Sequence, residues 1–278
     1  MAAGIEVRLG RLQSPASGRS VIVTLDATLF SGATGALAHP RSFANAIASE
    51  QPDAILAFPG LLTSISPDHK TGRIVNGTAS TTFNDPGEKV PTATPASVMR
   101  VGGDAVALHL NLGHSQAPRM LSQVALAIAD FEQSGIPALV ASYVPAIDPV
   151  REWRQIVHAA RVAADLGAAV VKTAYTGSPE TYSHVVEAAA PAHVVVAGGT
   201  PASTLDGLEA AKGAVAAGAW GVAYGRTIFE APDPLAALRA LKDVVHDLSE
   251  PSLCLDRQRT DPRSDQSSSM QSTKEHPV

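Results

Sequence analysis

Short apolar runs rich in valine, isoleucine and alanine recur along the chain, and longer segments with helical periodicity lie between them. Such runs are typical of strands buried in a parallel sheet, and the longer segments are typical of helices that cover the sheet. The predicted strands are Ser20–Asp26, Asp53–Phe58, Arg73–Thr78, Asp104–Leu110, Pro137–Tyr143, Ala168–Lys172, His193–Ala197 and Gly221–Gly225.

The segments predicted to be helical are Ser42–Glu50, Pro118–Ser134, Pro149–Leu166, Pro179–Ala190, Leu205–Ala217 and Pro234–Leu248. A small polar residue followed by proline predicts a helix start at Asp148-Pro149, Ser178-Pro179 and Asp233-Pro234. Gly135 and Gly167 are predicted to end two helices. Apolar residues at helical spacing predict a buried stripe on the second helix, formed by Met120, Leu121, Val124, Ile128 and Phe131.

Eight strands that alternate with helices in about 250 residues are typical of the (β/α)8 TIM barrel, an α/β fold. An open doubly wound sheet is the alternative, but the turn after the first strand lacks the G-x-G-x-x-G phosphate pattern. We therefore expect a single barrel domain over residues 1–248. The segment Gly60–Gly103 is rich in Pro, Gly, Thr and Ser, and it is predicted to form loops over the mouth of the barrel.

The end of the chain has a different composition. Residues 249–278 are rich in Ser, Asp, Arg and Gln, which predicts a disordered tail. The single cysteine, Cys254, lies in this tail, so neither an intrachain disulfide nor a thiolate metal site can form. A reducing cytoplasm is the expected location.

Bulk composition excludes several classes of function. The 278 residues are 45% hydrophobic and 17% charged, as in a soluble globular protein with one large core. A net charge of -5 with scattered basic residues does not favour nucleic-acid binding. No apolar stretch reaches about 18 residues and Met1–Ser20 lacks an apolar core, so neither a membrane span nor a signal peptide is predicted.

Lys172 is the most informative residue, because it ends the apolar run Ala168–Val171 where a buried strand opens into a loop. Partial removal from water disfavours the charged form of an amine, which makes Lys172 a candidate nucleophile toward a carbonyl. A structural ion pair or a surface location is the alternative for a single lysine.

Other polar residues end predicted strands and would meet Lys172 at the mouth of a barrel. Asp26 and Tyr143 add a carboxylate and a phenol, which together with an amine suffice for imine catalysis. Each has a structural alternative: Asp26 as a turn cap and Tyr143 as a half-buried aromatic. His109 and Asn111, at the end of the fourth strand, are candidates for binding the substrate.

A phosphate site is predicted at the seventh and eighth strands, because the loops there often bind this anion in such barrels. Gly198, Gly199 and Gly225 would let the backbone approach the phosphate, although glycine after a strand is also common in simple turns. The guanidinium of Arg226 can hydrogen-bond phosphate oxygens in a bidentate manner.

Aldol reactions can also be catalysed by a metal ion, so a metal-dependent mechanism is the main alternative to imine catalysis. The nine histidines show neither H-x-H nor H-E-x-x-H spacing. We therefore expect no required metal and no other cofactor.

The chain resembles the class I aldolase group that contains archaeal-type fructose-bisphosphate aldolases, 2-amino-3,7-dideoxy-D-threo-hept-6-ulosonate synthases and the autoinducer-2 phosphate thiolase. The resemblance extends over roughly Ser20 to His246. It rests on the motifs Ala107-Leu-His-Leu-Asn-Leu-Gly113, Val170-Val-Lys-Thr-Ala-Tyr-Thr-Gly177, Val196-Ala-Gly-Gly199 and Gly221-Val-Ala-Tyr-Gly-Arg-Thr-Ile-Phe229, followed by Asp233-Pro234.

The resemblance implies that Lys172 forms the Schiff base, Tyr143 is the general acid/base and Asp26 assists imine formation. It places Gly198, Gly199, Gly225 and Arg226 at the phosphate, and it implies a homo-oligomer. Two segments depart from the family pattern. Ala27-Thr28 stands where His-Gly is usual, and Val144-Pro145-Ala146 replaces a basic, glycine-containing turn.

The leading hypothesis is a metal-independent aldolase or transaldolase acting on a phosphorylated ketose or ketone, of the dihydroxyacetone phosphate or fructose-bisphosphate type. Coenzyme A-dependent acyl transfer from a phosphorylated diketone is a second possibility, and a phosphosugar-binding barrel without catalysis is a third. The sequence does not identify the acceptor aldehyde, the pathway, the reaction direction or the number of subunits.

Overall fold

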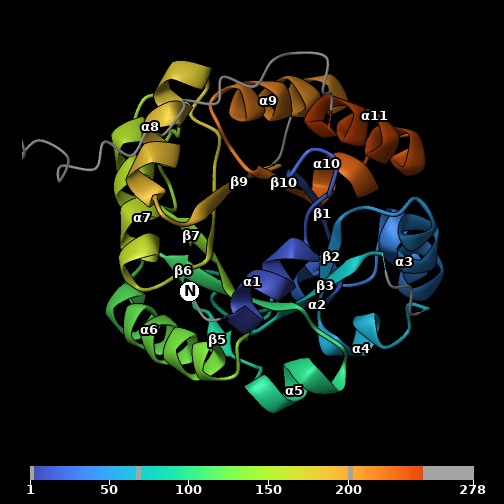
Figure 1. Ribbon diagram of the computed structural model, residues 1–278, viewed down its shortest axis with the longest axis horizontal. Coiled ribbons are helices and arrows are strands. Elements are labelled where there is room, and N and C mark those ends of the chain that lie inside the picture. The colour runs from blue at the N-terminus through green and yellow to red at the C-terminus, as the bar shows by residue number, and fades with distance from the viewer. Residues whose placement is uncertain (1–2, 67–69, 200–202, 247–278) are drawn as a thin grey trace, which may run out of the picture.

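Eight parallel strands close into a barrel in the computed structural model, which describes residues 3–66, 70–199 and 203–246 (Figure 1). Their order around the barrel is β1-β10-β9-β8-β7-β6-β3-β2. Their bounds are β1 Ser20–Thr24, β2 Ala54–Ala57, β3 Gly72–Asn76, β6 Ala105–Asn111, β7 Ala138–Tyr143, β8 Val170–Thr173, β9 His193–Ala197 and β10 Gly221–Tyr224. Every predicted strand is present, and the TIM barrel is confirmed over the open sheet.

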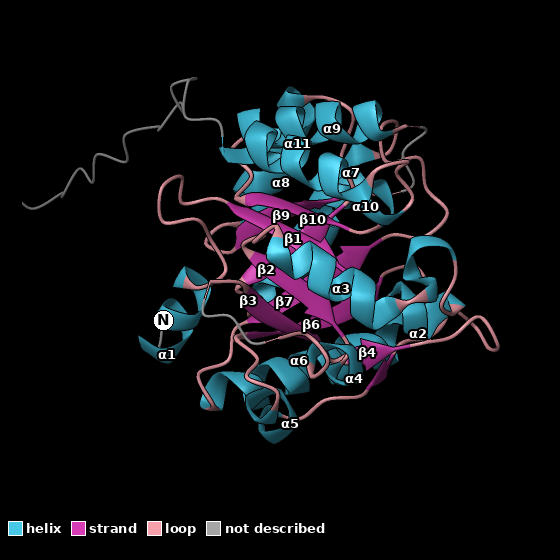
Figure 2. Cartoon of the chain, turned by 90° about the vertical axis from the view of Figure 1, so that its right-hand side faces the viewer, coloured by secondary structure: helices cyan, strands magenta, loops and turns pink. Residues whose placement is uncertain are grey.

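Long helices surround the strands, as Figures 1 and 2 show. They are α3 Pro40–Ser49, α6 Ala117–Gln133, α7 Trp153–Asp165, α8 Pro179–Ala189, α9 Thr204–Ala216 and α11 Pro234–His246. Two of the predicted starts are confirmed. Ser178 Oγ accepts a hydrogen bond from Thr181 N, and Asp233 Oδ1 accepts from two backbone N–H groups of the first turn of α11.

The third predicted start is wrong, because α7 begins at Trp153 and not at Pro149. Asp148 Oδ1 instead accepts hydrogen bonds from the N–H groups of Val150 and Arg151, which closes a turn ahead of the helix. The predicted helix ends at Gly135 and Gly167 are confirmed, since both have the positive φ that favours glycine, at 65° and 97°.

Several short elements were not predicted. They are α1 Ala3–Gly10, α2 Ala27–Ser31, a 3-10 helix over Gly35–Ala38, α4 Pro59–Leu62, α5 Pro95–Arg100, α10 Arg226–Phe229 and the antiparallel pair β4 Thr78–Ala79 and β5 Val90–Pro91. The segment Gly60–Gly103 therefore contains helices and strands as well as loops. Figure 2 shows that α1 and β4 lie at opposite ends of the barrel.

The core has two layers, one inside the barrel and one between the strands and the helices. Of the predicted stripe on α6, Met120, Val124, Ile128 and Phe131 are buried in the outer layer. Leu121 is the exception. It is 37% exposed, because the single residue step from Met120 rotates it by about 100° around the helix, to the edge of the buried face.

The inner layer is closed at the amino-terminal end of the strands by α1, so the segment that precedes β1 contributes apolar side chains to the core. Ile5, Leu9 and Leu12 are buried against inward-facing strand residues such as Ile22, Ile74 and Val170. Burial of each of these large side chains contributes about 1.5–3 kcal/mol. Because α1 covers the amino-terminal end, the barrel is open at the carboxyl ends of its strands.

Some predictions concern residues that the structure does not describe, and these include the tail over residues 249–278 with Cys254. Within the described part of the chain, no helix is long and apolar enough to cross a membrane.

Candidate active site

A cavity of about 1170 Å³ opens at the carboxyl ends of the barrel strands. Every site residue predicted from the sequence lines this cavity: Asp26, His109, Asn111, Tyr143, Lys172, Gly198, Gly199, Gly225 and Arg226. Residues that follow different strands are therefore brought to one place by closure of the barrel. Their functions stay predictions, whereas their common location is a property of the fold.

The alternation of side chains along each strand explains this convergence. Val170 of β8 belongs to the inner layer of the core, so Lys172, two residues further on, points from the same face toward the cavity. The same two-residue step leads from Ala107 to His109 on β6. Lys172 is half-buried, and its strand pairs with β7 on one side and β9 on the other.

Asp26 directly follows β1 and precedes α2, but its side chain makes no capping hydrogen bond. Its Oδ2 instead accepts a hydrogen bond of 2.8 Å from Nδ2 of Asn76, at the end of β3. The turn-cap alternative for Asp26 is therefore not what the structure shows. The sequence did not single out Asn76, although its position near the end of the predicted strand Arg73–Thr78 was a signal that could have identified it.

His109 is held by Thr78, whose Oγ1 lies 3.1 Å from His109 Nδ1 and accepts the backbone N–H of His109 at 3.0 Å. Burial lowers the pKa of His109 to about 4; Asp26 acts in the opposite direction, and Lys89 and Lys172 add to the lowering. The imidazole is therefore neutral at pH 7, where it can accept or donate a hydrogen bond but carries no charge.

This low pKa predicts how stability depends on pH. An unfolded histidine binds a proton near pH 6.5, whereas native His109 binds one only near pH 4, so acid favours the unfolded chain between these values. The free energy of unfolding is expected to fall by about 2 kcal/mol from this source by pH 5. Denaturant unfolding at pH 7 and pH 5 measures this decrease in the free energy of unfolding. In a His109→Gln variant the decrease should be smaller by about 2 kcal/mol, because glutamine does not titrate in this range.

The exposed His39 offers a matched control. A His39→Gln variant is expected to lose as much stability as the wild type between pH 7 and pH 5. An equal loss in the His109→Gln variant would contradict the assignment.

Asn111 makes a structural hydrogen bond that the sequence did not predict. Its side chain is 7% exposed, and its Nδ2 donates a hydrogen bond of 2.7 Å to the backbone oxygen of Gly87. The amide thus fixes the loop between β4 and β5 to the end of β6. Asn111 also borders the cavity, and its amide has a second N–H and an oxygen, so its predicted role in substrate binding stays a prediction.

Tyr143 ends β7, where it pairs with Asn111 of β6, and it is half-buried at the cavity wall. The turn that follows it, Val144-Pro145-Ala146, departs from the pattern of the similar family. Ala146 has a φ of 64°, a left-handed conformation that glycine adopts without strain. The backbone of this turn thus has a conformation that favours glycine, although alanine occupies the position.

The predicted phosphate residues lie together beyond β9 and β10. A Cβ at Gly198 would lie 2.8 Å from Thr227 Oγ1 and 2.9 Å from the Tyr224 ring, so packing explains this glycine. Gly199 has a φ of 57° and open space around its Cα, which fits a turn that faces a ligand. Arg226 is exposed at the start of α10. Residues 200–202, which continue this loop, lie outside the described ranges.

The sequence analysis missed other residues that line the cavity. They include Phe30, Asn76, Thr78, Lys89, Tyr175 and Asp206. Tyr175 follows β8 in the same motif as Lys172, so its position was a usable signal, whereas Lys89 lies in an irregular loop without any such pattern. Among the described residues, no group of three or more His, Cys, Asp or Glu side chains is arranged to hold a metal ion.

Comparison with known proteins extends these observations. A 2-amino-3,7-dideoxy-D-threo-hept-6-ulosonate synthase of Halobacterium salinarum is 35% identical over 259 residues, 92% of this chain and 96% of that protein. A 3-hydroxy-5-phosphonooxypentane-2,4-dione thiolase of Yersinia pseudotuberculosis is 29% identical over 246 residues, 87% of this chain and 82% of that protein.

The fold has a counterpart among solved structures. An archaeal fructose 1,6-bisphosphate aldolase superposes with a TM-score of 0.78 at 24% identity, over 87% of this chain and 99% of the other. The sequence profile of the DeoC/LacD family aldolases matches residues 20–231, which include all the site residues predicted above. This chain therefore belongs to the DeoC/LacD family of aldolases.

Proposed function

We propose that this protein is a class I aldolase, in which Lys172 forms an imine with a phosphorylated ketone donor and a carbon–carbon bond to an aldehyde is then made or broken. The main observation that supports this proposal is the order of the strands around the cavity. Strand β8, with Lys172, lies between β7, which ends at Tyr143, and β9, which precedes the glycine pair. The amine, the phenol and the proposed anion site therefore belong to adjacent strands.

In the proposed reaction, the Lys172 amine attacks the donor carbonyl and forms a carbinolamine, which loses water to give the protonated imine. Loss of a proton from the adjacent carbon gives an enamine, whose electron pair forms the new bond to the aldehyde carbon. Tyr143 moves the protons at these steps, and Asp26, oriented by Asn76, assists the loss of water. Water then releases the product and regenerates the amine.

The donor phosphate would bind at Gly199, Gly225 and Arg226, where a guanidinium and tightly turned backbone face the cavity. The name of the relative from Yersinia pseudotuberculosis supports a phosphorylated substrate, since that protein is a thiolase for a phosphonooxy diketone. Membership of an aldolase family favours an enzyme over a barrel that only binds phosphosugars.

Reductive trapping tests the mechanism. Borohydride added in the presence of dihydroxyacetone phosphate is expected to attach the reduced donor irreversibly to the peptide that contains Lys172. Peptide mass spectrometry provides the measurement, and the peptide containing the exposed Lys212 is the internal control. Product formation with an unmodified Lys172 would exclude the imine.

The relative from Yersinia pseudotuberculosis gives one reason to consider acyl transfer as a second candidate function. The same imine would then be followed by transfer of an acyl group to coenzyme A. Turnover that requires coenzyme A would favour this reaction, whereas aldol product formed in its absence would favour the aldolase.

A further inference from the structure

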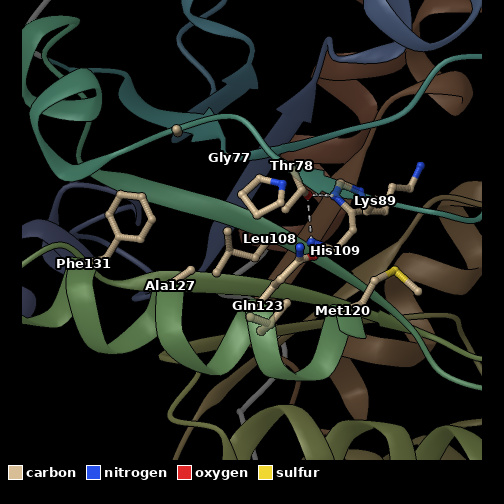
Figure 3. Close-up of a pocket in the computed structure, with 12 residues that line it drawn as sticks. Gly77, Thr78, Lys89, Leu108, His109, Met120, Gln123, Ala127 and Phe131 are labelled. Atoms are coloured by element: carbon tan, nitrogen blue, oxygen red, sulfur yellow. Dashed lines mark hydrogen bonds between the residues drawn. The ribbon is translucent and has the colours of Figure 1, made fainter. Parts of the chain in front are cut away.

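Lys89 places a second amine at the mouth of the cavity, in the loop that joins β4 to β5. Its Nζ lies 5.1 Å from the centre of the Phe30 ring and donates a hydrogen bond to Ser80 Oγ. Figure 3 is a close-up of a small neighbouring pocket and draws Lys89 near Thr78 and His109, three residues that line both that pocket and the cavity. None of the functions proposed above uses this side chain.

The loop that carries Lys89 is held in place by the barrel. Asn111 Nδ2 bonds Gly87 O at 2.7 Å, His114 Nε2 lies 2.9 Å from Asp85 Oδ2, and Thr82 N donates to Phe30 O at 3.1 Å. An ion pair at 3.2 Å joins Arg119 of α6 to Glu88. These contacts connect the loop to β6, α6 and α2, so the Lys89 amine has a fixed position and not that of a free surface lysine.

The charge environment of Lys89 leaves room for an anionic ligand. Within the described part of the chain, its only short polar contact is the neutral hydroxyl of Ser80, and no carboxylate forms an ion pair with it. Burial lowers the pKa of Lys89, while the more distant Asp26 and Asp85 act in the opposite direction. An anion bound at this amine would therefore favour its charged form.

The position of Lys89 in the ring of strands indicates which part of a substrate it would meet. In the closed order of eight strands, β3 lies opposite β9, so the loop after β3 faces the glycine pair across the mouth. Lys172 lies on the wall between them. A donor with its phosphate at the glycine turns and its carbonyl at Lys172 would leave the Lys89 side of the cavity for the acceptor.

We propose that Lys89 binds an anionic group, a carboxylate or a phosphate, at the far end of the acceptor aldehyde and so selects anionic over neutral acceptors. This assignment rests on the proposed aldolase function. A cavity of about 1170 Å³ has space for a donor and an acceptor together, because small-molecule sites usually measure about 300–1000 Å³.

The test compares charged and neutral acceptors of matched size with dihydroxyacetone phosphate as donor. Succinic semialdehyde is paired with butanal, and glyceraldehyde 3-phosphate with glyceraldehyde. In a Lys89→Met variant, the ratio of kcat/KM for charged over neutral acceptors is expected to fall about 10- to 100-fold, as for loss of a charge-assisted hydrogen bond. Lys89→Arg should restore part of the ratio, and a variant of the exposed Lys212, Lys212→Met, should keep it.

The possible outcomes separate this assignment from the function on which it rests. The acceptor pair with the larger fall identifies carboxylate or phosphate as the preferred anion. An equal fall in kcat/KM for charged and neutral acceptors would mean that Lys89 only stabilises the loop or Asp26. That result would overturn the assignment of Lys89 but not the proposed aldolase function. Absence of a borohydride adduct at Lys172 in the wild type would overturn both proposals.

Discussion

A Lys172→Met variant is expected to form no borohydride adduct and to lose kcat by a factor on the order of 10⁴ or more, because the nucleophile cannot be replaced by water. Lys172 is half-buried at the end of β8, and methionine has a similar length, so the barrel should fold normally. Steady-state kinetics and adduct mass measure the effect, and circular dichroism and thermal melting verify the fold.

Two further variants make this test specific. Lys172→Arg keeps a positive charge in the cavity but removes the amine nucleophile, so it should be as inactive as Lys172→Met. Lys212→Met removes an exposed lysine of α9 and should retain activity. Substantial turnover by Lys172→Arg would mean that charge at this position, and not imine formation, drives the reaction.

A Tyr143→Phe variant is expected to lower kcat by about 10²- to 10³-fold, because a positioned acid/base group typically contributes this much. The imine should still form with the donor, since Lys172 is intact. The measurement is the rate at which the donor exchanges its carbon-bound proton with deuterated water, followed by NMR without acceptor. This rate should fall in parallel with kcat.

The barrel supplies a matched tyrosine for comparison. Tyr175 also lines the cavity, but its hydroxyl lies against Gly213 on α9, so close that a Cβ at this glycine would be 2.0 Å from the oxygen. Tyr175→Phe should therefore have a small effect on proton exchange. Similar losses in both variants would show that the aromatic wall, and not the Tyr143 hydroxyl, is what the reaction requires.

The departures from the family pattern lie at the same mouth as these residues. Ala27 lines the cavity directly after Asp26, at the start of α2. An alanine there supplies neither a charge nor a hydrogen-bond donor from its side chain, so the polar partner of Asp26 comes from Asn76 on β3. The Asp26 carboxylate is thus oriented from β3.

The sequence by itself determined the architecture and the location of the main catalytic candidates. Buried parallel strands appear as continuous apolar runs, and all eight were found within two residues of their bounds. A polar residue that ends such a run must lie at the carboxyl end of the barrel, whichever strand it follows. Lys172, Tyr143 and Asp26 could therefore be grouped without knowledge of any contact.

Only the tertiary structure shows which of the candidate side chains already make hydrogen bonds within the protein. The Asp26–Asn76 bond joins residues 50 positions apart, and Asn111 binds a loop oxygen 24 positions before it. Local periodicity reports how one segment divides its apolar and polar faces, but it carries no information on such distant partners.

The same reason explains α1 and Lys89. The apolar face of α1 finds its partner only when strands from the whole chain have closed into a ring, which exposes one apolar end. Lys89 lies in an irregular loop, and only the contacts of that loop with β6, α6 and α2 give its amine a place in the cavity. Closure of the barrel therefore determines which residues form the site, because it alone brings these separate segments into contact.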